Sequence, residues 1–95
     1  MKVEDVLSCK ARMKILKILN ELGELNVSKI ASKLKLNHSV TSKHLKVLEE
    51  EGILKQKSFG RTRLYSLNER SPKAKAIKNL IEVWEQTNKH KPKVN

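Results

Sequence analysis

The stretch of sequence that decides the fold runs from Ser28 to Gly52: SKIASKLKLNHSVTSKHLKVLEEEG. Its first part carries apolar residues at three- and four-residue steps, the spacing of one helix face. Ser28 is expected to cap this helix, and Asn37 to cap a second helix that Gly52 ends. The second helix has a buried stripe formed by Thr41, Leu45 and Leu48. Two short helices around a brief polar turn predict a helix-turn-helix over residues 28–51.

A β-hairpin is predicted immediately after it, over residues 53–67. β-favouring residues stand on both sides of the pair Gly60-Arg61, which is typical of a turn. Ser71 as N-cap and Pro72 as the first helical residue then predict another helix over residues 72–87. A basic hairpin directly after a helix-turn-helix indicates a winged helix-turn-helix, a mainly α fold with a small β-hairpin (α+β).

The ends of the chain complete a single domain, which we place at residues 1–88. Apolar residues recur at helical spacing between Lys10 and Leu22, and Gly23 is expected to end that helix. The preceding residues 3–7 have a weaker apolar face and form either a separate short helix or an extension of the same one. Residues 89–95 lack an apolar period, so we expect a basic, disordered tail.

The charge and the apolar content of the chain limit the classes of partner that it can bind. Lysine and arginine number 21 against 10 acidic residues in a chain of 95, giving a formal charge of +11. Such a charge attracts polyanions, and double-stranded DNA is the leading partner. No apolar run has the ~18 to 20 residues that span a bilayer, and the charged start is unlike a signal peptide. We therefore expect no membrane partner and a cytoplasmic, nucleoid-associated protein.

The second helix of the helix-turn-helix carries the candidate recognition face. Polar and basic residues lie opposite its apolar stripe or near its first turn: His38, Ser39, Val40, Ser42, Lys43 and Lys46. The DNA major groove, about 12 Å wide, admits one helix whose side chains reach base edges and phosphates. The alternative is a solvated helix face without a ligand. As a set, these residues favour DNA binding.

Three glutamates, residues 49–51, crowd the end of this helix, where negative charge opposes the helix dipole. They either repel phosphate and so orient the helix on DNA, or pair with Lys46 or Lys55 as surface acids.

The hairpin carries the second candidate DNA contact. Its basic residues cluster around Gly60 and are Lys55, Lys57, Arg61 and Arg63. A projecting wing of this kind lies along the DNA backbone or enters a minor groove, for which arginine is well suited. The alternative is a solvated edge strand whose charge discourages aggregation.

The last predicted helix has an apolar set that needs cover, formed by Ile77, Leu80, Ile81 and Trp84. Exposed together, these side chains would make a large apolar patch on a small protein. They either bury against a second copy of the chain, giving a homodimer, or pack on the first helix of the same chain. We expect the dimer.

The remaining reactive side chains do not indicate an enzyme, a cofactor or a metal site. His38, His44 and His90 lack the spacing and the neighbouring ligands of a zinc site, and His44 is expected to pack with a hydrogen bond. Cys9 is the single cysteine, which excludes an internal disulfide. It either forms a disulfide between two chains or acts as a redox switch, or it is inert. Phosphate-binding loops, nucleophile elbows and paired catalytic carboxylates are absent from the sequence.

The run from Leu25 to Leu48 resembles the ArsR family of winged-helix repressors, most specifically in Ser42-Lys43-His44-Leu45-Lys46-Val47-Leu48. The resemblance covers roughly Cys9 to Leu67, although MarR-type winged helices are similar at this level. It implies that the second helix enters the major groove, that the hairpin is the wing and that the terminal helices build a dimer. Metal sensors of the family carry a cysteine pair where this chain has Asn26-Val27-Ser28-Lys29, so no metal is expected there.

We therefore expect a sequence-specific DNA-binding regulator, with repression as the resemblance implies, that binds a pseudo-palindromic operator as a homodimer. One alternative is an architectural protein that coats DNA without sequence preference, because the charge alone supplies such affinity. A second alternative is a winged-helix module that binds other proteins.

Overall fold

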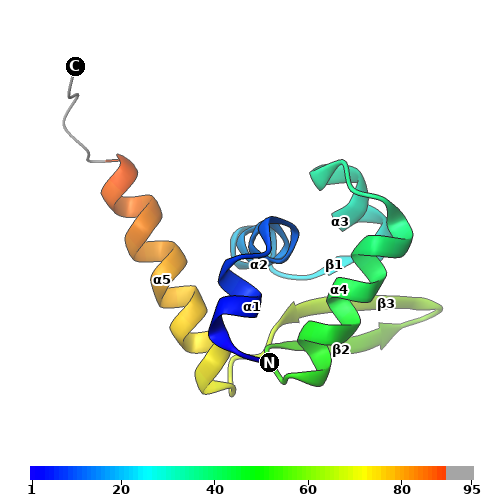
Figure 1. Ribbon diagram of the computed structural model, residues 1–95. Coiled ribbons are helices and arrows are strands. Elements are labelled where there is room, and N and C mark those ends of the chain that lie inside the picture. The colour runs from blue at the N-terminus through cyan, green and yellow to red at the C-terminus, as the bar shows by residue number, and fades with distance from the viewer. Residues whose placement is uncertain (90–95) are drawn as a thin grey trace.

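The computed structural model describes residues 1–89 and contains helices, a small sheet and short connections (Figure 1). The helices are α1 (Val3–Leu7), α2 (Lys10–Leu22), α3 (Val27–Leu34), α4 (His38–Glu50) and α5 (Pro72–Lys89). The strands are β1 (Leu25–Asn26), β2 (Leu54–Phe59) and β3 (Thr62–Leu67). This order of elements is a winged helix-turn-helix, as predicted. The segment before α2 is a separate helix, which decides between the two alternatives for residues 3–7.

The hairpin belongs to a three-stranded antiparallel sheet in the order β1-β3-β2. Phe59 pairs with Thr62 across the turn, and Gly60 adopts the positive φ of 65° that such a turn requires. The third strand, β1, was not predicted: it has two residues, which pair with Tyr65 and Leu64 of β3. A strand this short has no alternation of its own, so only its tertiary partner reveals it.

The helix-turn-helix begins two residues earlier than predicted. The N-cap of α3 is Asn26, whose Oδ1 accepts a hydrogen bond of 2.8 Å from the amide of Lys29, so the expected cap Ser28 is wrong. The chain leaves β1 at Asn26, which places an asparagine oxygen where the orphan amides need it. The cap of α4 is as predicted, since Asn37 Oδ1 accepts from the amides of Ser39 and Val40 at 2.8 and 3.2 Å.

One apolar core joins these elements. Its fully buried members come from α2, α3, α4 and the start of the hairpin: Ile15, Leu16, Leu19, Ile30, Leu45, Leu48, Ile53 and Leu54. The predicted stripe of α4 is buried throughout, including Thr41. In α2 the buried side chains are Ile15, Leu16 and Leu19, whereas Leu22 at the end of the helix is exposed. The core therefore fixes which face of α4 is left to solvent.

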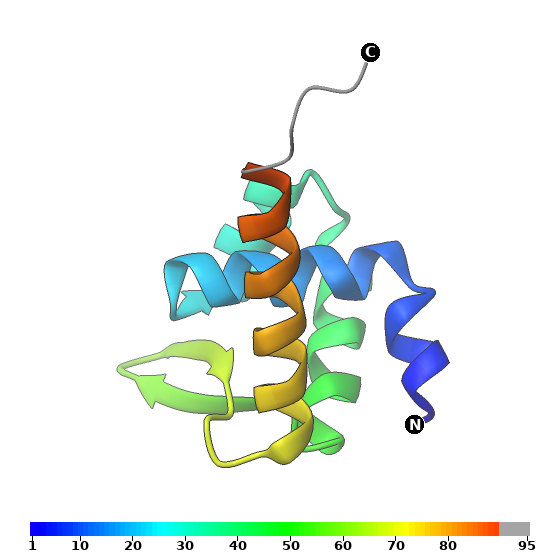
Figure 2. The same ribbon diagram turned by 90° about the vertical axis from the view of Figure 1, so that its left-hand side faces the viewer.

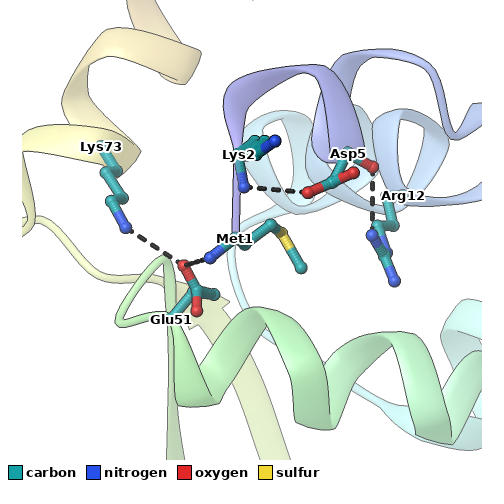
Figure 3. Close-up of polar contacts among 6 residues, drawn as sticks. All are labelled: Met1, Lys2, Asp5, Arg12, Glu51 and Lys73. Atoms are coloured by element: carbon teal, nitrogen blue, oxygen red, sulfur yellow. Dashed lines mark hydrogen bonds and ion pairs between the residues drawn. The ribbon is translucent and has the colours of Figure 1, made fainter.

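Polar contacts hold α1 against the rest of the molecule (Figure 3). The amino group of Met1 lies 3.1 Å from Glu51 at the end of α4, and the same carboxylate accepts from Lys73 of α5 at 3.1 Å. These two hydrogen bonds, that of Met1 first, hold the pKa of Glu51 below its usual value. Arg12 of α2 donates to the carbonyl of Asp5 in α1 at 3.0 Å.

The long helix α5 crosses α2 (Figure 2) and is tied to it by an ion pair of 2.8 Å between Lys17 and Glu85. Its start is as predicted, because Ser71 Oγ accepts from the amide of Ala74. Its end is later than predicted: α5 continues through Lys89, which had been assigned to the tail. The rest of that expected tail, residues 90–95, lies outside the described residues.

Candidate nucleic-acid interface

Helix α4 presents the predicted recognition residues on its exposed side. His38, Ser39, Lys43 and Lys46 are exposed, and Ser42 is half-buried. At about 100° per residue, these five positions fall within an arc of roughly 140°, opposite the buried stripe. Val40 lies outside that arc but is also exposed. The helix is therefore divided into a buried apolar face and an exposed polar and basic face.

The position of α4 is fixed by the contacts of its buried face. Leu45 and Leu48 are completely buried in the core. Thr41 is buried too, and its hydroxyl donates to the carbonyl of Asn37 at 2.8 Å. A helix anchored along its length presents its exposed side chains in a defined orientation, which base recognition requires.

His44 provides a further anchor between helices. Its Nδ1 accepts a hydrogen bond of 3.2 Å from Nε of Arg12 in α2, which confirms the expected packing role. Burial lowers the pKa of His44, and the positive charge of Arg12 lowers it further. Only the neutral imidazole has a lone pair on Nδ1, so the contact requires His44 without its extra proton.

This contact predicts a pH dependence of stability. In the unfolded chain His44 binds a proton near its usual pKa of 6.5, whereas in the folded chain it resists protonation. Below pH 6.5 the unfolded state therefore binds more protons, and the free energy of unfolding falls until the pH passes the lowered pKa of the folded state. Replacing His44 by glutamine, whose amide oxygen still accepts from Arg12, should remove this acid-side loss.

Urea unfolding followed by circular dichroism between pH 7.5 and 5 measures the effect. The matched control is His38→Gln, which removes an exposed imidazole from the same helix. The control should follow the wild-type profile. A His44→Gln variant that loses stability on acidification as steeply as the wild type would contradict the assignment.

The hairpin has two faces, which divide its four basic residues. Gln56 lies on the face toward α4, because its amide donates to Glu49 at 2.9 Å. Lys57 lies on the other face and pairs with Glu24, just after α2, at 3.2 Å. By alternation Lys55 shares the face of Lys57, whereas Arg63, which is paired with Ser58, shares the α4 side. Arg61 lies in the turn itself.

Lys55 and Lys57 therefore stand apart from the recognition helix. They line a groove of about 550 Å³ between the sheet, the end of α2 and the first half of α5. Lys75 and Lys78 of α5 line its other wall. The structure thus brings Arg61 and Arg63 toward the tip and the α4 side of the wing, and it leaves the two lysines at the base.

Two of the three glutamates at residues 49–51 have structural partners. Glu49 accepts from Gln56, and Glu51 accepts from Lys73 and from the amino group of Met1. Glu49 and Glu51 therefore have partners, but these are not the predicted Lys46 and Lys55. Met1 and Lys73 are distant from Glu51 in the chain, so the sequence around Glu51 does not indicate these contacts.

Helix α5 divides the predicted dimer residues into two sets. Ile81 is buried in the core of its own chain, and Ile77 packs half-buried against that core. Leu80 and Trp84 are exposed, with 40 and 62% of their surface accessible. Val83, which is not among the predicted dimer residues, is 54% exposed beside them. An apolar surface of Leu80, Val83 and Trp84 therefore remains uncovered in the single chain.

The other candidate residues are placed as follows. Cys9 is a half-buried free thiol at the N-cap of α2. Residues 1–89 contain no cluster of three or more histidine, cysteine, aspartate or glutamate side chains that would hold a metal. Within the same part of the chain, no helix combines the length and apolarity needed to cross a membrane.

Two further exposed features near the candidate interface were not predicted from the sequence. Phe59, the last residue of β2, is 72% exposed at the tip of the wing. Lys33 and Lys35 are exposed at the end of α3, next to the turn that leads into α4. Their position at the helix-turn-helix junction was a usable indication, since the first helix of this motif crosses the DNA backbone.

Comparison with known proteins agrees with this arrangement. The family model described as "Bacterial regulatory protein, arsR family" matches residues 9–56. The arsenical resistance operon repressor of Escherichia coli K12 is 34% identical over 79 residues, covering 83% of this chain and 67% of the relative.

Solved structures give the same result. The transcriptional repressor PagR of Bacillus anthracis is 30% identical with a TM-score of 0.70, over 84% of this chain and 85% of that one. A homodimeric winged helix-turn-helix domain, Mb0332 of Mycobacterium bovis, has a TM-score of 0.72 at 22% identity, over 98 and 84% of the two chains. The chain therefore belongs to the arsR family of bacterial regulatory proteins and is a winged helix-turn-helix, DNA-binding transcriptional regulator.

Proposed function

We propose that the protein represses transcription by binding, as a homodimer, to a pseudo-palindromic operator in double-stranded DNA. The observation that carries the proposal is the division of α4 into a buried face and an exposed face with Lys43, Lys46, Ser39 and Ser42. Placed in a major groove, this face offers donors and acceptors to base edges and charge to phosphates. Such a protein works in the cytoplasm, on the DNA of the nucleoid.

The wing supplies a second contact with the same duplex. Arg61 lies in the turn, and Arg63 lies on the side of the hairpin that faces α4. Figure 1 shows α4 and the hairpin on one side of the molecule and α5 on the opposite side. In this arrangement α4 occupies a major groove while the two arginines reach the backbone or the adjacent minor groove.

The apolar surface of α5 supports the homodimer. Leu80, Val83 and Trp84 are exposed residues of α5, and Figure 1 shows α5 on the side of the molecule opposite the wing, so a second copy that packs on α5 leaves α4 free. A two-fold dimer presents two recognition helices to half-sites about one helical turn, roughly 34 Å, apart. The homodimeric relative Mb0332 and the relatives described as repressors support this assembly and the direction of regulation.

Selection of bound duplexes from a random DNA pool tests the proposal, followed by affinity measurements on the selected duplex and a scrambled control across a salt series. A recurrent inverted repeat, bound at least ~10³-fold more tightly than the control, is the expected result. Tight binding without a motif, collapsing steeply with salt, would instead identify an architectural protein, a role that the charge of +11 also favours. No binding would indicate a protein-interaction module.

Substitutions in the recognition helix and in the wing should weaken DNA binding in different ways. Lys43→Ala is expected to relax the preference at one base pair of each half-site, by about 1–3 kcal/mol of discrimination. Arg61→Ala is expected to weaken binding to all sequences and to lower the salt slope by about 1 for each phosphate that the protein no longer neutralises. Titration of the operator and of single-base variants at several salt concentrations separates the effects. If Lys43→Ala weakens every duplex equally, Lys43 does not read a base.

A further inference from the structure

Phe59 has the largest exposed fraction, 72%, among the large apolar side chains of residues 1–89. It ends β2 and pairs with Thr62 across the Gly60-Arg61 turn, so its ring stands at the outermost part of the hairpin, on the strand face that it shares with Lys57. Single exposed apolar residues are ordinary on protein surfaces. An aromatic ring at the tip of a projecting hairpin is different, because no neighbouring element is placed to cover it.

The charged residues of the hairpin that carries Phe59 are all basic. The hairpin from Leu54 to Leu67 contains no acidic residue, and its charges are those of Lys55, Lys57, Arg61 and Arg63. An apolar protein partner or an uncharged surface would gain nothing from these charges. The minor groove of DNA combines two phosphate rows with apolar sugar walls and base edges between them, which matches an apolar ring beside Arg61 at the tip of a basic hairpin.

We propose that the ring of Phe59 enters the DNA minor groove beside each half-site and acts there as an apolar wedge against a base step. This inference rests on the proposed function, since it requires α4 to place the wing on DNA. Phenylalanine is among the side chains that proteins insert between base steps, partly unstacking them. Flexible pyrimidine–purine steps yield most easily, so Phe59 favours operators with such a step in the flank.

An apolar wedge differs from an arginine contact in its response to salt. Insertion of the ring removes apolar surface from water but neutralises no phosphate and releases no counterion. Loss of the ring should therefore lower affinity by a similar factor at every salt concentration, about tenfold after the cost of unstacking is deducted. Loss of Arg61 should instead change the slope.

The test uses the full chain and the selected operator, labelled in separate duplexes with 2-aminopurine at each flanking step. Phe59→Ala is compared with Phe59→Leu, which keeps an apolar wedge, and with Thr62→Ala. Thr62 is a matched control because it is exposed and lies opposite Phe59 on the same face of the hairpin. Circular dichroism verifies that each variant keeps the wild-type fold.

We expect wild-type protein and Phe59→Leu to raise 2-aminopurine fluorescence at one flanking step, as unstacking does. Phe59→Ala should lose this rise and bind about tenfold more weakly with an unchanged salt slope, whereas Thr62→Ala should resemble the wild type. Wild-type affinity and fluorescence in Phe59→Ala would overturn the wedge while leaving the proposed function intact. A wild-type protein that selects no duplex would overturn the proposed function itself.

Discussion

Replacement of Leu45 by alanine is expected to lower the free energy of unfolding by about 2–5 kcal/mol, the usual cost of deleting a fully buried leucine side chain. Leu45 has no accessible surface and holds the middle of α4 against the core. In a domain of this size each kcal/mol shifts the melting temperature by about 4–8 °C. The variant should therefore melt roughly 10 to 40 °C below the wild type.

Lys46→Ala, at the next position on the exposed face, is the matched control and should change stability by less than about 0.5 kcal/mol. Thermal unfolding by circular dichroism, at one protein concentration because a dimer's stability depends on it, measures both. A decrease below about 1 kcal/mol for Leu45→Ala would mean that α4 is not anchored as described.

Leu80→Glu is the second large effect that we expect. If the surface of Leu80, Val83 and Trp84 is the dimer interface, each dimer buries the new carboxylate twice without a partner. The dimer dissociation constant should rise at least about 100-fold. Operator affinity should fall by roughly 10²–10⁴, because a monomer loses the second half-site.

The Leu80→Glu variant keeps a tryptophan whose fluorescence reports on the proposed interface. Trp84 is the single tryptophan of the chain, so its emission should shift to the red when the partner is lost. Gln86→Glu adds the same charge to an exposed position about 120° around α5 from Leu80, outside the apolar set, and should stay dimeric. Analytical ultracentrifugation at micromolar concentration decides the matter, and a dimeric Leu80→Glu variant would place the interface elsewhere.

Local chemistry was sufficient to predict most of the fold. Asn37 caps α4, Ser71 caps α5 and Gly60 turns the hairpin, each because of a property of its own side chain or backbone. The buried stripe of α4 follows from helical periodicity alone. Sequence reasoning failed where the cause was distant: β1 exists because β3 pairs with it, and Asn26 caps α3 because that strand ends there.

The same distinction applies to the candidate site. The sequence by itself determined which side chains are available: a polar, basic face on α4, a basic hairpin and an apolar stripe on α5. Only the tertiary structure separated Arg61 and Arg63 from Lys55 and Lys57, and the exposed Leu80 and Trp84 from the buried Ile81. Periodicity tells which residues share a face, but what covers that face depends on contacts between elements far apart in the chain.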